Sequence, residues 1–542
     1  MNSIIRDRIF LLLCLTLPFL FIPGSFQLHF IGGPVGTMLM VYAILAAYAY
    51  TFYCYKKDKE IFIDKCSFLK FAYIYITIMF ISLVHGLFIY QYYDLIFSGP
   101  IDQIEKLPKL INFLSVFNIQ INEKFLLGVW MIIRFFKGII LEIIYTFGFS
   151  YILYCWYKNE PHVAIKIIKH SIYYISVIII LFGVVELCYL FGYNWARDVL
   201  EYVNPWLHEI KANFNWWPPL LWKGRMRNIF PEPSFFGMYI AFIIPFLWAE
   251  ILNGKRKLLN LTLVCFITLF MFLTQSKTAV LLFLGEVFLL SVYVLYKRVV
   301  WRKLILIFIA VILAAFISIC CIENYNSKPF NNFFIDRTLT QIMVDNNQTS
   351  NIAKTKIVSK KSFNTADKYI KRNITGVIDP KSGSNNARFA IMKSDIRIWQ
   401  DHLFLGIGKG LKSGYTGDYL TPDERKVGEV KMWAHQQNTK GVLKAGYPSV
   451  SEYTKLLAEV GIIGLLIYVF PFLFILYNFF KKRKTNKITI YYNNDVICML
   501  IALTGSFFMG LSGVMTNIQT YWLLLGIAYA YVIIIKNKKM KV

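Results

Sequence analysis

"GRMRNIFPEPSFFGMYIAFIIPFLWAE", from Gly224 to Glu250, places two arginines and a glutamate directly before a long apolar run. The run approaches the roughly 20 residues that an α-helix needs to cross the hydrocarbon core of a bilayer. Prolines on both sides of Glu232 stiffen the chain ahead of the run, and Ser234 can cap the helix that follows. The stretch therefore predicts a membrane span with charged groups held at its mouth.

Similar apolar runs recur along most of the 542 residues, of which 57% are hydrophobic, 17% aromatic and only 16% charged. This composition predicts an all-α polytopic membrane protein. The net charge of +27 does not indicate nucleic-acid binding, because many basic residues stand in short clusters between apolar runs. Such clusters are typical topology signals, so we expect no nucleic-acid partner.

The basic clusters fix the predicted orientation. Placing all of them in the cytoplasm satisfies the positive-inside rule and gives about twelve spans with both termini cytoplasmic. The first run, which follows Arg6 and Arg8, is kept as a span because no A-x-A-like cleavage site follows it. The predicted spans are 9–24, 35–55, 67–90, 136–156, 171–192, 234–250, 258–274, 279–296, 304–322, 453–479, 495–512 and 519–535.

Three parts of the chain follow from this topology. Residues 1–322 form a membrane domain with spans one to nine and two outer loops, 91–125 and 193–233. Residues 323–452 form a large extracytoplasmic loop, and residues 453–542 form a second membrane segment with spans ten to twelve. Long external loops are exempt from the charge rule, so the many lysines of the large loop do not disturb this topology.

The large loop changes character part-way along. Residues 324–386 are rich in Asn, Lys and Ser, which predicts a flexible or weakly folded segment. From Ala387, "ARFAIMKSDIRIWQDHLFLGIGKG" predicts an amphipathic helix with Arg388 and Arg397 off its apolar face. We interpret "GIGKG" as a glycine turn, because it follows no strand and lacks the full nucleotide fingerprint. The predicted apolar face consists of Phe389, Met392, Ile396 and Trp399.

The charged residues near the outer span ends have two interpretations each. Arg225 and Arg227 form either a solvated juxtamembrane pair or a phosphate site, since the guanidinium fork binds phosphate oxygens bidentately. Glu232 is either a carboxylate favoured by the helix dipole or a fixed general base. Lys277, in "LTQSKTAVLLF", is either a loop lysine or a third cation facing the same pocket.

Metal chemistry is not indicated. The seven histidines and nine cysteines show no ligand spacing, and the chain has no D-x-D pair of the kind that holds a metal-bound sugar nucleotide. We therefore expect no metal and no cofactor. His435, in the large loop, is either a solvated histidine or a base.

Four stretches carry a resemblance to the O-antigen polymerase and O-antigen ligase family of bacterial envelopes. "RMRNIFPEPSFFGMYIAFIIP" resembles the arginine-bearing start of a family span. "TQSKTAVLLFLGE" resembles the T-x-S-R-x-x segment, with Lys277 where Arg is usual. "RFAIMKSDIRIWQDHLFLGIGKG" is similar to the R…W…P-L-x-G-x-G-x-G block, and "SVSEYTKLLAEVGIIGLL" to the H-N-x-x-L-x-x-L-x-E-x-G-x-x-G segment. The resemblance covers roughly residues 220 to 470.

The resemblance implies a GT-C-like fold and a metal-independent, inverting glycosyltransferase on the outer leaflet of the bacterial inner (cytoplasmic) membrane. Its partners would be an undecaprenyl-pyrophosphate-linked glycan donor, a glycan acceptor and membrane lipid. A chain-length regulator is a further partner that the sequence leaves open. The carried-over cations would bind the pyrophosphate and stabilise it as it leaves. They are Arg225 or Arg227, Lys277 and Arg388, with Arg397 as a fourth candidate.

Three functions stay open, in order of preference. Family ligases carry His at the start of the H-N segment, where this chain has Val450 and Ser451, so the pattern favours a polymerase that joins repeat units into surface polysaccharide. Its base would be Glu232 or His435. The first alternative is a ligase that transfers glycan to lipid A-core or another acceptor. The second is a polysaccharide flippase or transporter, disfavoured because the chain shows no repeated halves and its charges cluster at outer span ends.

Overall fold

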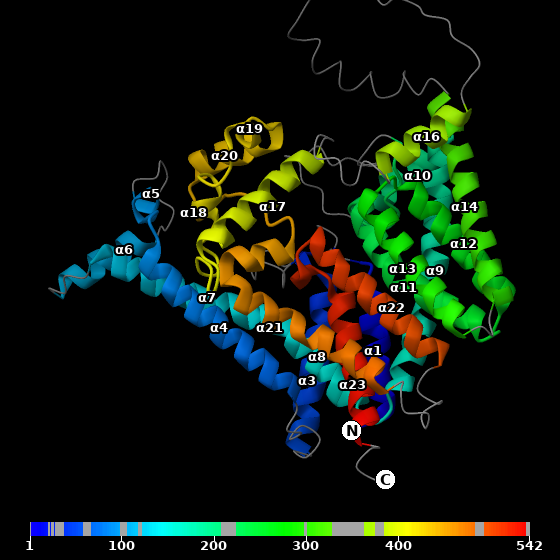
Figure 1. Ribbon diagram of the computed structural model, residues 1–542, viewed down its shortest axis with the longest axis horizontal. Helices are drawn as coiled ribbons and strands as arrows, with labels where there is room; N and C mark the ends of the chain where they lie inside the picture. The colour runs from blue at the N-terminus through cyan, green and yellow to red at the C-terminus, as the bar shows by residue number, and fades with distance from the viewer. Residues whose placement is uncertain are drawn as a thin grey trace, which may run out of the picture.

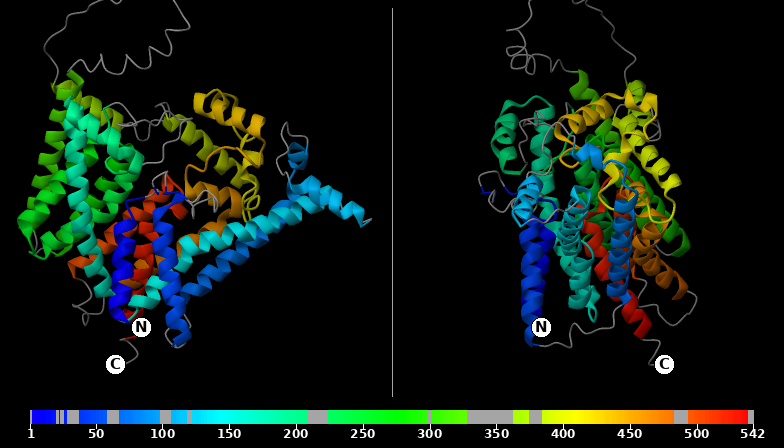
Figure 2. Two further views of the ribbon diagram at one scale, coloured as in Figure 1. Left: turned by 180° about the vertical axis from the view of Figure 1, so that it is seen from behind. Right: turned by 90° about the vertical axis from the view of Figure 1, so that its left-hand side faces the viewer.

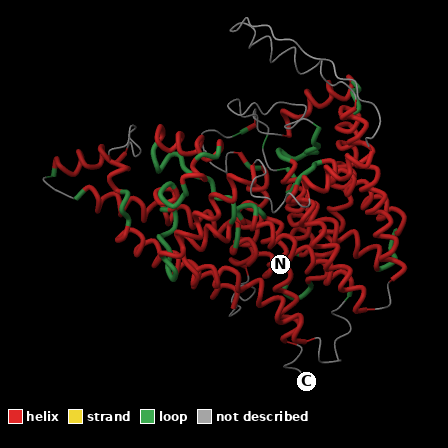
Figure 3. Tube along the Cα trace, turned by 45° about the horizontal axis from the view of Figure 1, so that its top comes forward, coloured by secondary structure: helices red, strands yellow, loops and turns green. Residues whose placement is uncertain are grey.

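A computed structural model describes residues 2–19, 22, 26–27, 37–57, 67–97, 106–117, 122–207, 224–297, 301–327, 362–373, 384–482 and 493–537. Within these residues the chain consists of helices and connecting loops, without a β-strand (Figure 3). The predicted all-α class is therefore confirmed.

The helices fall into two groups by length and composition (Figure 1). The mainly apolar helices are α1 (Ser3–Thr16), α3 (Leu39–Lys57), α4 (Ser67–Ile89), α7 (Glu123–Tyr145), α8 (Phe147–Tyr157), α9 (Pro161–Leu190), α11 (Pro233–Leu252), α12 (Lys257–Leu273), α13 (Lys277–Lys297), α14 (Trp301–Ser327), α21 (Glu452–Lys482), α22 (Asn494–Phe508) and α23 (Gln519–Asn537). The shorter or more polar helices are α5 (Tyr93–Phe97), α6 (Lys106–Val116), α10 (Asn194–Leu207), α16 (Ser362–Asn373), α17 (Ser384–Asp401), α18 (Lys412–Thr416), α19 (Pro422–Arg425) and α20 (Gly428–Lys440), with single turns η6 (Met509–Leu511) and η7 (Met515–Asn517).

Seven helices among the described residues are long and apolar enough to cross a membrane: α4, α9, α11, α13, α14, α21 and α22. Helices α12 and α23 are also apolar but shorter. The protein is thus a polytopic all-α membrane protein, and the count of about twelve spans stays a prediction.

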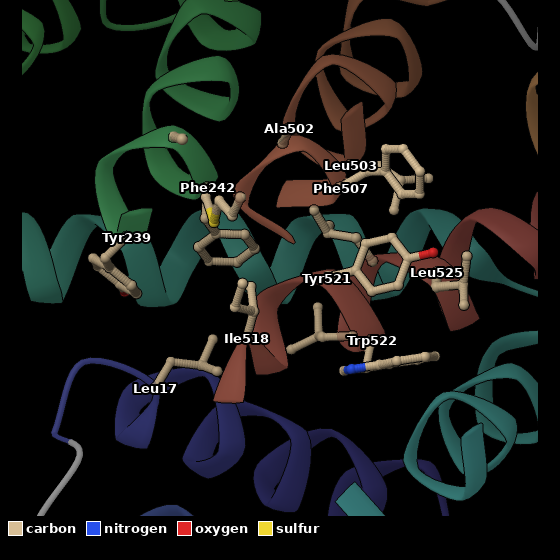
Figure 4. Close-up of a cluster of buried hydrophobic side chains, with 14 of the residues drawn as sticks. Leu17, Tyr239, Phe242, Ala502, Leu503, Phe507, Ile518, Tyr521, Trp522 and Leu525 are labelled. Atoms are coloured by element: carbon tan, nitrogen blue, oxygen red, sulfur yellow. The ribbon is translucent and has the colours of Figure 1, made fainter. Parts of the chain in front are cut away.

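Helix α11 lies at the centre of the helix bundle. Of its apolar window 89% is buried, compared with 33% of that of α4. It packs against α12, α13 and α22 (Figures 1 and 2). Because α11 is surrounded by protein on most sides, the loop that begins it is held firmly. Figure 4 shows part of the core between α1, α11, α22 and α23, with Leu17, Tyr239, Phe242, Ala502, Leu503, Phe507, Ile518, Tyr521, Trp522 and Leu525.

The two ends of the bundle differ. Helix α1 begins and α23 ends at one end, whereas α16 to α20 lie at the opposite end (Figures 1 and 2). This arrangement agrees with a topology in which the large loop and the chain termini lie on different sides. The loop segments 328–361 and 374–383, on which the prediction of a weakly folded segment largely rests, lie outside the described residues.

The apolar run 136–156, predicted as one span, is divided between α7 and α8. Thr146 separates them with non-helical angles (φ −119°, ψ −102°), and its hydroxyl donates to the Glu142 carbonyl at 2.6 Å. Helix α8 packs against α23, whereas α7 extends beside α4 away from the bundle (Figures 1 and 2). Hydropathy does not reveal this break, because both halves are equally apolar and only their packing partners differ.

Helix α17 was predicted correctly, but its buried face was not. Ile396 is 37% exposed, whereas Asp395 is fully buried, with Lys412 at 3.0 Å and the Thr454 hydroxyl donating to it at 2.9 Å. A pattern of apolar residues cannot anticipate a buried ion pair. The buried residues of α17 are Ala387, Ala390, Ile391, Ser394, Asp395 and Ile398, instead of the predicted Phe389, Met392, Ile396 and Trp399.

The "GIGKG" segment is a packed glycine turn, as predicted. The backbone amides of Ile407 and Gly408 donate to the carbonyls of Ala458 and Glu459, both at 2.9 Å. These carbonyls lie just before a kink in α21 at Gly461, whose φ of +67° is readily adopted only by glycine. A Cβ on Gly461 would lie 2.2 Å from the Phe404 carbonyl oxygen. The turn therefore anchors the C-terminal end of α17 to the kink of α21.

Candidate functional site

The segment 224–232, which we call the arginine loop, connects to the start of α11 and is held from below by α9. The Glu186 carboxylate of α9 accepts hydrogen bonds from the backbone amides of Asn228 at 2.8 Å and Arg227 at 3.4 Å. Asn228 has a positive φ of 55°, and its side-chain amide donates to the Ile179 carbonyl at 2.9 Å. A buried carboxylate within a membrane-crossing helix thus fixes the backbone of the loop.

Arg227 points into the protein. The residue is 2% exposed, one guanidinium nitrogen donates to the Pro231 carbonyl at 3.4 Å, and Nε has no hydrogen-bond partner among the described residues. Burial lowers the pKa of Arg227 to about 10, although the charge of Glu186 opposes this shift. Arg227 is therefore a buried positive charge beneath the loop, and the solvated-pair interpretation does not hold for it.

Arg225 lies half-buried at the junction of three other elements. The Gly224 carbonyl beside it accepts hydrogen bonds from the Gln275 side-chain amide at 3.0 Å and from the Tyr325 hydroxyl at 2.9 Å. Burial lowers the pKa of Arg225, the positive charge of Arg372 on α16 lowers it further, and Tyr325 opposes the shift. Two guanidinium groups from distant parts of the chain therefore lie close enough for one charge to act on the other, which favours binding of an anion nearby.

Lys277 begins α13 close to the start of α11. The two helix starts approach so closely that a Cβ on Gly237 would lie 2.2 Å from that of Ala279. The amide ends of both helices consequently point to the same region, and helix N-termini favour negative charge. We call this group the cationic mouth; it comprises Arg225, Lys277, Arg372 and the first turns of α11 and α13.

Arg388 reaches the bundle from the α17 side. It is exposed on α17, and its guanidinium donates to the Ser512 carbonyl at 3.3 Å. Ser512 belongs to the turn between α22 and α23, in which a Cβ on Gly513 would lie 3.5 Å from the Met238 side chain of α11. Arg388 is thus connected to the first turns of α11 through one intervening turn.

Arg397 has a different environment. It forms a two-pronged ion pair with Glu424 at 2.7 and 2.9 Å and also donates to the Tyr419 carbonyl at 2.7 Å. The hydrogen bonds that Arg397 donates to Glu424 raise the pKa of Arg397. Its spacing from Arg388, about two and a half helical turns, places the two arginines on opposite faces of α17. The structure therefore does not bring Arg397 to the cationic mouth, and its guanidinium is already occupied.

The two candidate bases are also separated. Glu232 is the residue before α11, is half-buried, and accepts a hydrogen bond from the Ser234 hydroxyl at 3.2 Å. His435 is exposed on α20, which packs against α17, the helix that carries Arg397. Only Glu232 belongs to an element of the cationic mouth.

Sequence reasoning missed four residues that build this region: Glu186, Gln275, Tyr325 and Arg372. Glu186 could have been noticed, because a carboxylate in the middle of an apolar run is rare and usually has a role. Gln275 stands inside the quoted "TQSK" segment, with a positive φ of 49°. The approach of Arg372 could not be anticipated, since α16 lies far along the chain in a segment of polar composition.

Residues 261–469 match a family sequence model described as O-Antigen ligase. The match supports assignment to the O-antigen ligase and polymerase family, as the motifs indicated. Among curated proteins, no sequence matches the chain.

The O-antigen ligase family match runs from α12 to α21. It contains Lys277, Arg388, Arg397 and His435, whereas the arginine loop precedes it. The match supports a membrane-embedded, glycan-processing activity of the ligase or polymerase type, and lipid-linked glycans as the kind of substrate. The match does not distinguish a polymerase from a ligase, so the choice between them rests on the residues of the site.

Proposed function

We propose that the protein polymerises undecaprenyl-pyrophosphate-linked oligosaccharide repeat units into a surface polysaccharide, such as O-antigen, capsule or exopolysaccharide. The observation that carries the proposal is the cationic mouth, where Arg225, Arg372 and the start of α13 at Lys277 meet beside the N-terminus of α11. Positive side chains and helix N-termini together suit a pyrophosphate.

The proposed chemistry is an inverting, metal-independent glycosyl transfer. An acceptor hydroxyl attacks the anomeric carbon of the donor sugar, and the bond from that carbon to the pyrophosphate oxygen breaks. The bonding electron pair leaves with the lipid pyrophosphate, while the hydroxyl proton passes to a base. Arg225 and Lys277 would stabilise the departing negative charge, a role that a metal ion fills in other transferases.

The helix ends support a site on the outer leaflet of the inner membrane. The basic cluster Lys255–Lys257 lies between α11 and α12, at the end of these helices opposite to the arginine loop. The positive-inside rule places this cluster in the cytoplasm, so the arginine loop faces outward and both chain termini face inward. An outward site matches a donor whose glycan is presented on the outer leaflet.

Glu232 is the base that we propose. It is the last residue of the arginine loop and directly precedes the first turn of α11, whereas His435 is exposed on α20. A base must come within hydrogen-bond reach of the acceptor hydroxyl, and Glu232 is the candidate that already borders the pyrophosphate site.

Two observations help to choose between a polymerase and a ligase. The positions that align with the His-Asn pair of family ligases hold Val450 and Ser451, both buried, and the Ser451 hydroxyl donates to the Gly510 carbonyl at 3.2 Å. Neither side chain can accept a proton from an acceptor hydroxyl in this arrangement, which favours the polymerase. The ligase stays the second candidate because the matching family model carries that description.

Gene deletion and complementation test the proposal. The native host lacking the gene would be complemented with wild type, Arg225→Ala, Arg388→Ala and the matched control Arg397→Ala, with membrane levels of each protein checked. We expect wild type and Arg397→Ala to restore a ladder of surface glycan on a gel. The Arg225→Ala and Arg388→Ala strains should carry single repeat units on the surface anchor.

Other outcomes would replace the proposal. Finished polymer stranded on undecaprenyl pyrophosphate, with no glycan attached to the anchor, would identify a ligase. Repeat units trapped on the inner leaflet would identify a flippase. A full ladder in the Arg225→Ala strain would show that the cationic mouth does not take part in catalysis.

A further inference from the structure

Helix α16 contributes residues to the cationic mouth although it lies outside every quoted motif. It packs against α13 and α14 at the end of the bundle where the arginine loop lies (Figures 1 and 2). The Tyr369 hydroxyl donates to the Phe272 carbonyl at 2.9 Å, and its ring packs edge-on against the Phe272 ring with centroids 6.4 Å apart. Tyr369 thereby fixes the C-terminal turn of α16 to the end of α12.

Gln275 links this turn to the arginine loop. Its side-chain amide nitrogen donates to the Gly224 carbonyl, and its side-chain oxygen accepts a hydrogen bond from Arg372 at 3.4 Å. One side chain therefore contacts both the loop that carries Arg225 and the helix that carries Arg372. The long hydrogen bond is weak, so the guanidinium can change partners when an anion is present.

Within the described part of the chain, no carboxylate contributes to the pKa shift of Arg225 at this junction. Among the described groups that shift the pKa of Arg225, Arg372 is the other charged residue, and it is positive. Arg225 is half-buried and Arg372 is exposed, and the positive charge of Arg372 disfavours the charged form of Arg225, a cost that a bound anion would offset. Arg372 also stabilises the C-terminus of α16 through the helix dipole, and this purely structural role is what the test must separate.

A second, independent observation comes from the next residue. Asn373 is 1% exposed, yet neither its side-chain oxygen nor its side-chain nitrogen has a hydrogen-bond partner in the described structure. Buried amide groups are nearly always hydrogen-bonded, so an unsatisfied one adjacent to a cation indicates a missing polar ligand. An amide N–H suits a phosphate oxygen.

We infer that Arg372 and Asn373 of α16 form, with Arg225, an anion subsite that binds one phosphate of the donor pyrophosphate. This inference rests on the proposed function and adds a binding element from the large loop that the family motifs do not contain. Tyr369 is a positioning residue in this arrangement, because it acts by holding the C-terminal turn of α16 in place.

Binding of inorganic pyrophosphate to the purified full-length protein in detergent tests the inference. Isothermal titration would compare wild type with Arg372→Ala, Asn373→Asp and the control Lys371→Ala. Lys371 is the adjacent cation, and its ion pair with Asp367 at 2.8 Å is exposed to solvent. Loss of one charge-assisted contact should weaken binding about tenfold in Arg372→Ala. Lys371→Ala should bind like wild type, and all variants should melt within about 2 °C of wild type.

Further variants separate a specific contact from general charge. Arg372→Lys should recover part of the affinity, and Tyr369→Phe, which loses only the hydroxyl, should weaken binding less than Arg372→Ala. Equal losses in Arg372→Ala and Lys371→Ala would overturn the inference in favour of long-range attraction. Normal binding in Arg372→Ala, with binding lost in Arg225→Ala, would overturn the subsite but leave the proposed function standing. Failure of wild type to bind pyrophosphate would overturn both.

Discussion

The hydrogen bonds between Glu186 of α9 and the arginine loop can be tested by Glu186→Gln, because this nearly isosteric change removes one negative charge. In Glu186→Gln the carboxylate that accepts from the Asn228 amide at 2.8 Å becomes an amide. One of its oxygens becomes an N–H group that faces a backbone donor. Hydrogen bonds to charged groups contribute about 1.5–3 kcal/mol. Removing the charge opposite buried Arg227 adds a further cost, although no direct ion pair is formed.

We therefore expect Glu186→Gln to lower the free energy of unfolding by about 2–3 kcal/mol, corresponding to a melting temperature about 2–3 °C lower for a chain of 542 residues. Thermal unfolding of the purified protein in detergent measures this change, and the glycan gel measures activity. Glu201→Gln is the control, since Glu201 forms an exposed ion pair with Arg197 at 2.7 Å on α10. Such pairs contribute about 0–1 kcal/mol.

A double-mutant cycle tests the physical reasoning itself. If Glu186 compensates the buried charge, Arg227→Met combined with Glu186→Gln should cost less than the sum of the two single changes. A melting temperature of Glu186→Gln equal to wild type would refute the view that α9 holds the arginine loop. Strict additivity in the cycle would refute the charge compensation while leaving the hydrogen bonds in place.

Three further predictions concern residues of α17, α19 and α21. Gly461→Ala should destabilise the protein or abolish its expression, because at a φ of +67° the added Cβ would lie 2.2 Å from the Phe404 carbonyl oxygen. The control Gly128→Ala should be tolerated, because an added Cβ there has no atom within 4 Å. Equal melting temperatures of the two variants would contradict this prediction. Arg397→Ala should lower the melting temperature by a few degrees yet retain transfer activity per intact molecule, and lost activity in a folded variant would return Arg397 to the site. Burial raises the pKa of Glu424, but the hydrogen bonds that its carboxylate accepts from Arg397 outweigh this effect, so its pKa is lowered. Its stabilisation is therefore present above the usual glutamate pKa of about 4.3 and lost as the pH falls below it. Hydrogen exchange of α19 should rise in this acid range in wild type and stay flat in Arg397→Ala.

The sequence predicted the features that depend on composition along the chain. Long apolar runs predicted the all-α membrane class, and the glycines of "GIGKG" predicted a tight packed turn. Both signals are local, since a helix and a glycine turn are each decided within a few residues. The division of α7 from α8 at Thr146 was not predictable, because it depends on which distant helices each half contacts.

The candidate site was predictable in part, for the same reason. Arg225 and Lys277 could be selected because they stand at the starts of apolar runs, where charge is conspicuous. The partners that decide their roles lie elsewhere in the chain: Glu186 beneath the loop, and Arg372 on a helix of the large loop. A one-dimensional pattern ranks Arg225 and Arg227 equally, whereas burial separates a half-exposed cation from one that is 2% exposed.

The quoted motifs also divide into two kinds of segment once their contacts are known. The "TQSK" segment supplies Lys277 to the cationic mouth, and its Gln275 contacts the arginine loop. The segment therefore contributes a cation for anion binding and also holds the loop that carries Arg225. The "SVSEY" segment has a structural part instead: the Glu452 amide donates to the Gly513 carbonyl at 3.1 Å, and the Glu452 carboxylate accepts from the Met515 amide at 3.0 Å. Both bonds hold the turn between α22 and α23, in which the Ser512 carbonyl accepts a hydrogen bond from Arg388. A substitution at Glu452 should therefore reduce activity by displacing Arg388, without any contact between Glu452 and substrate. Restoration of activity by a second-site change that re-anchors this turn would support that view, whereas an altered pH profile in a well-folded Glu452→Gln variant would instead assign Glu452 a part in proton transfer.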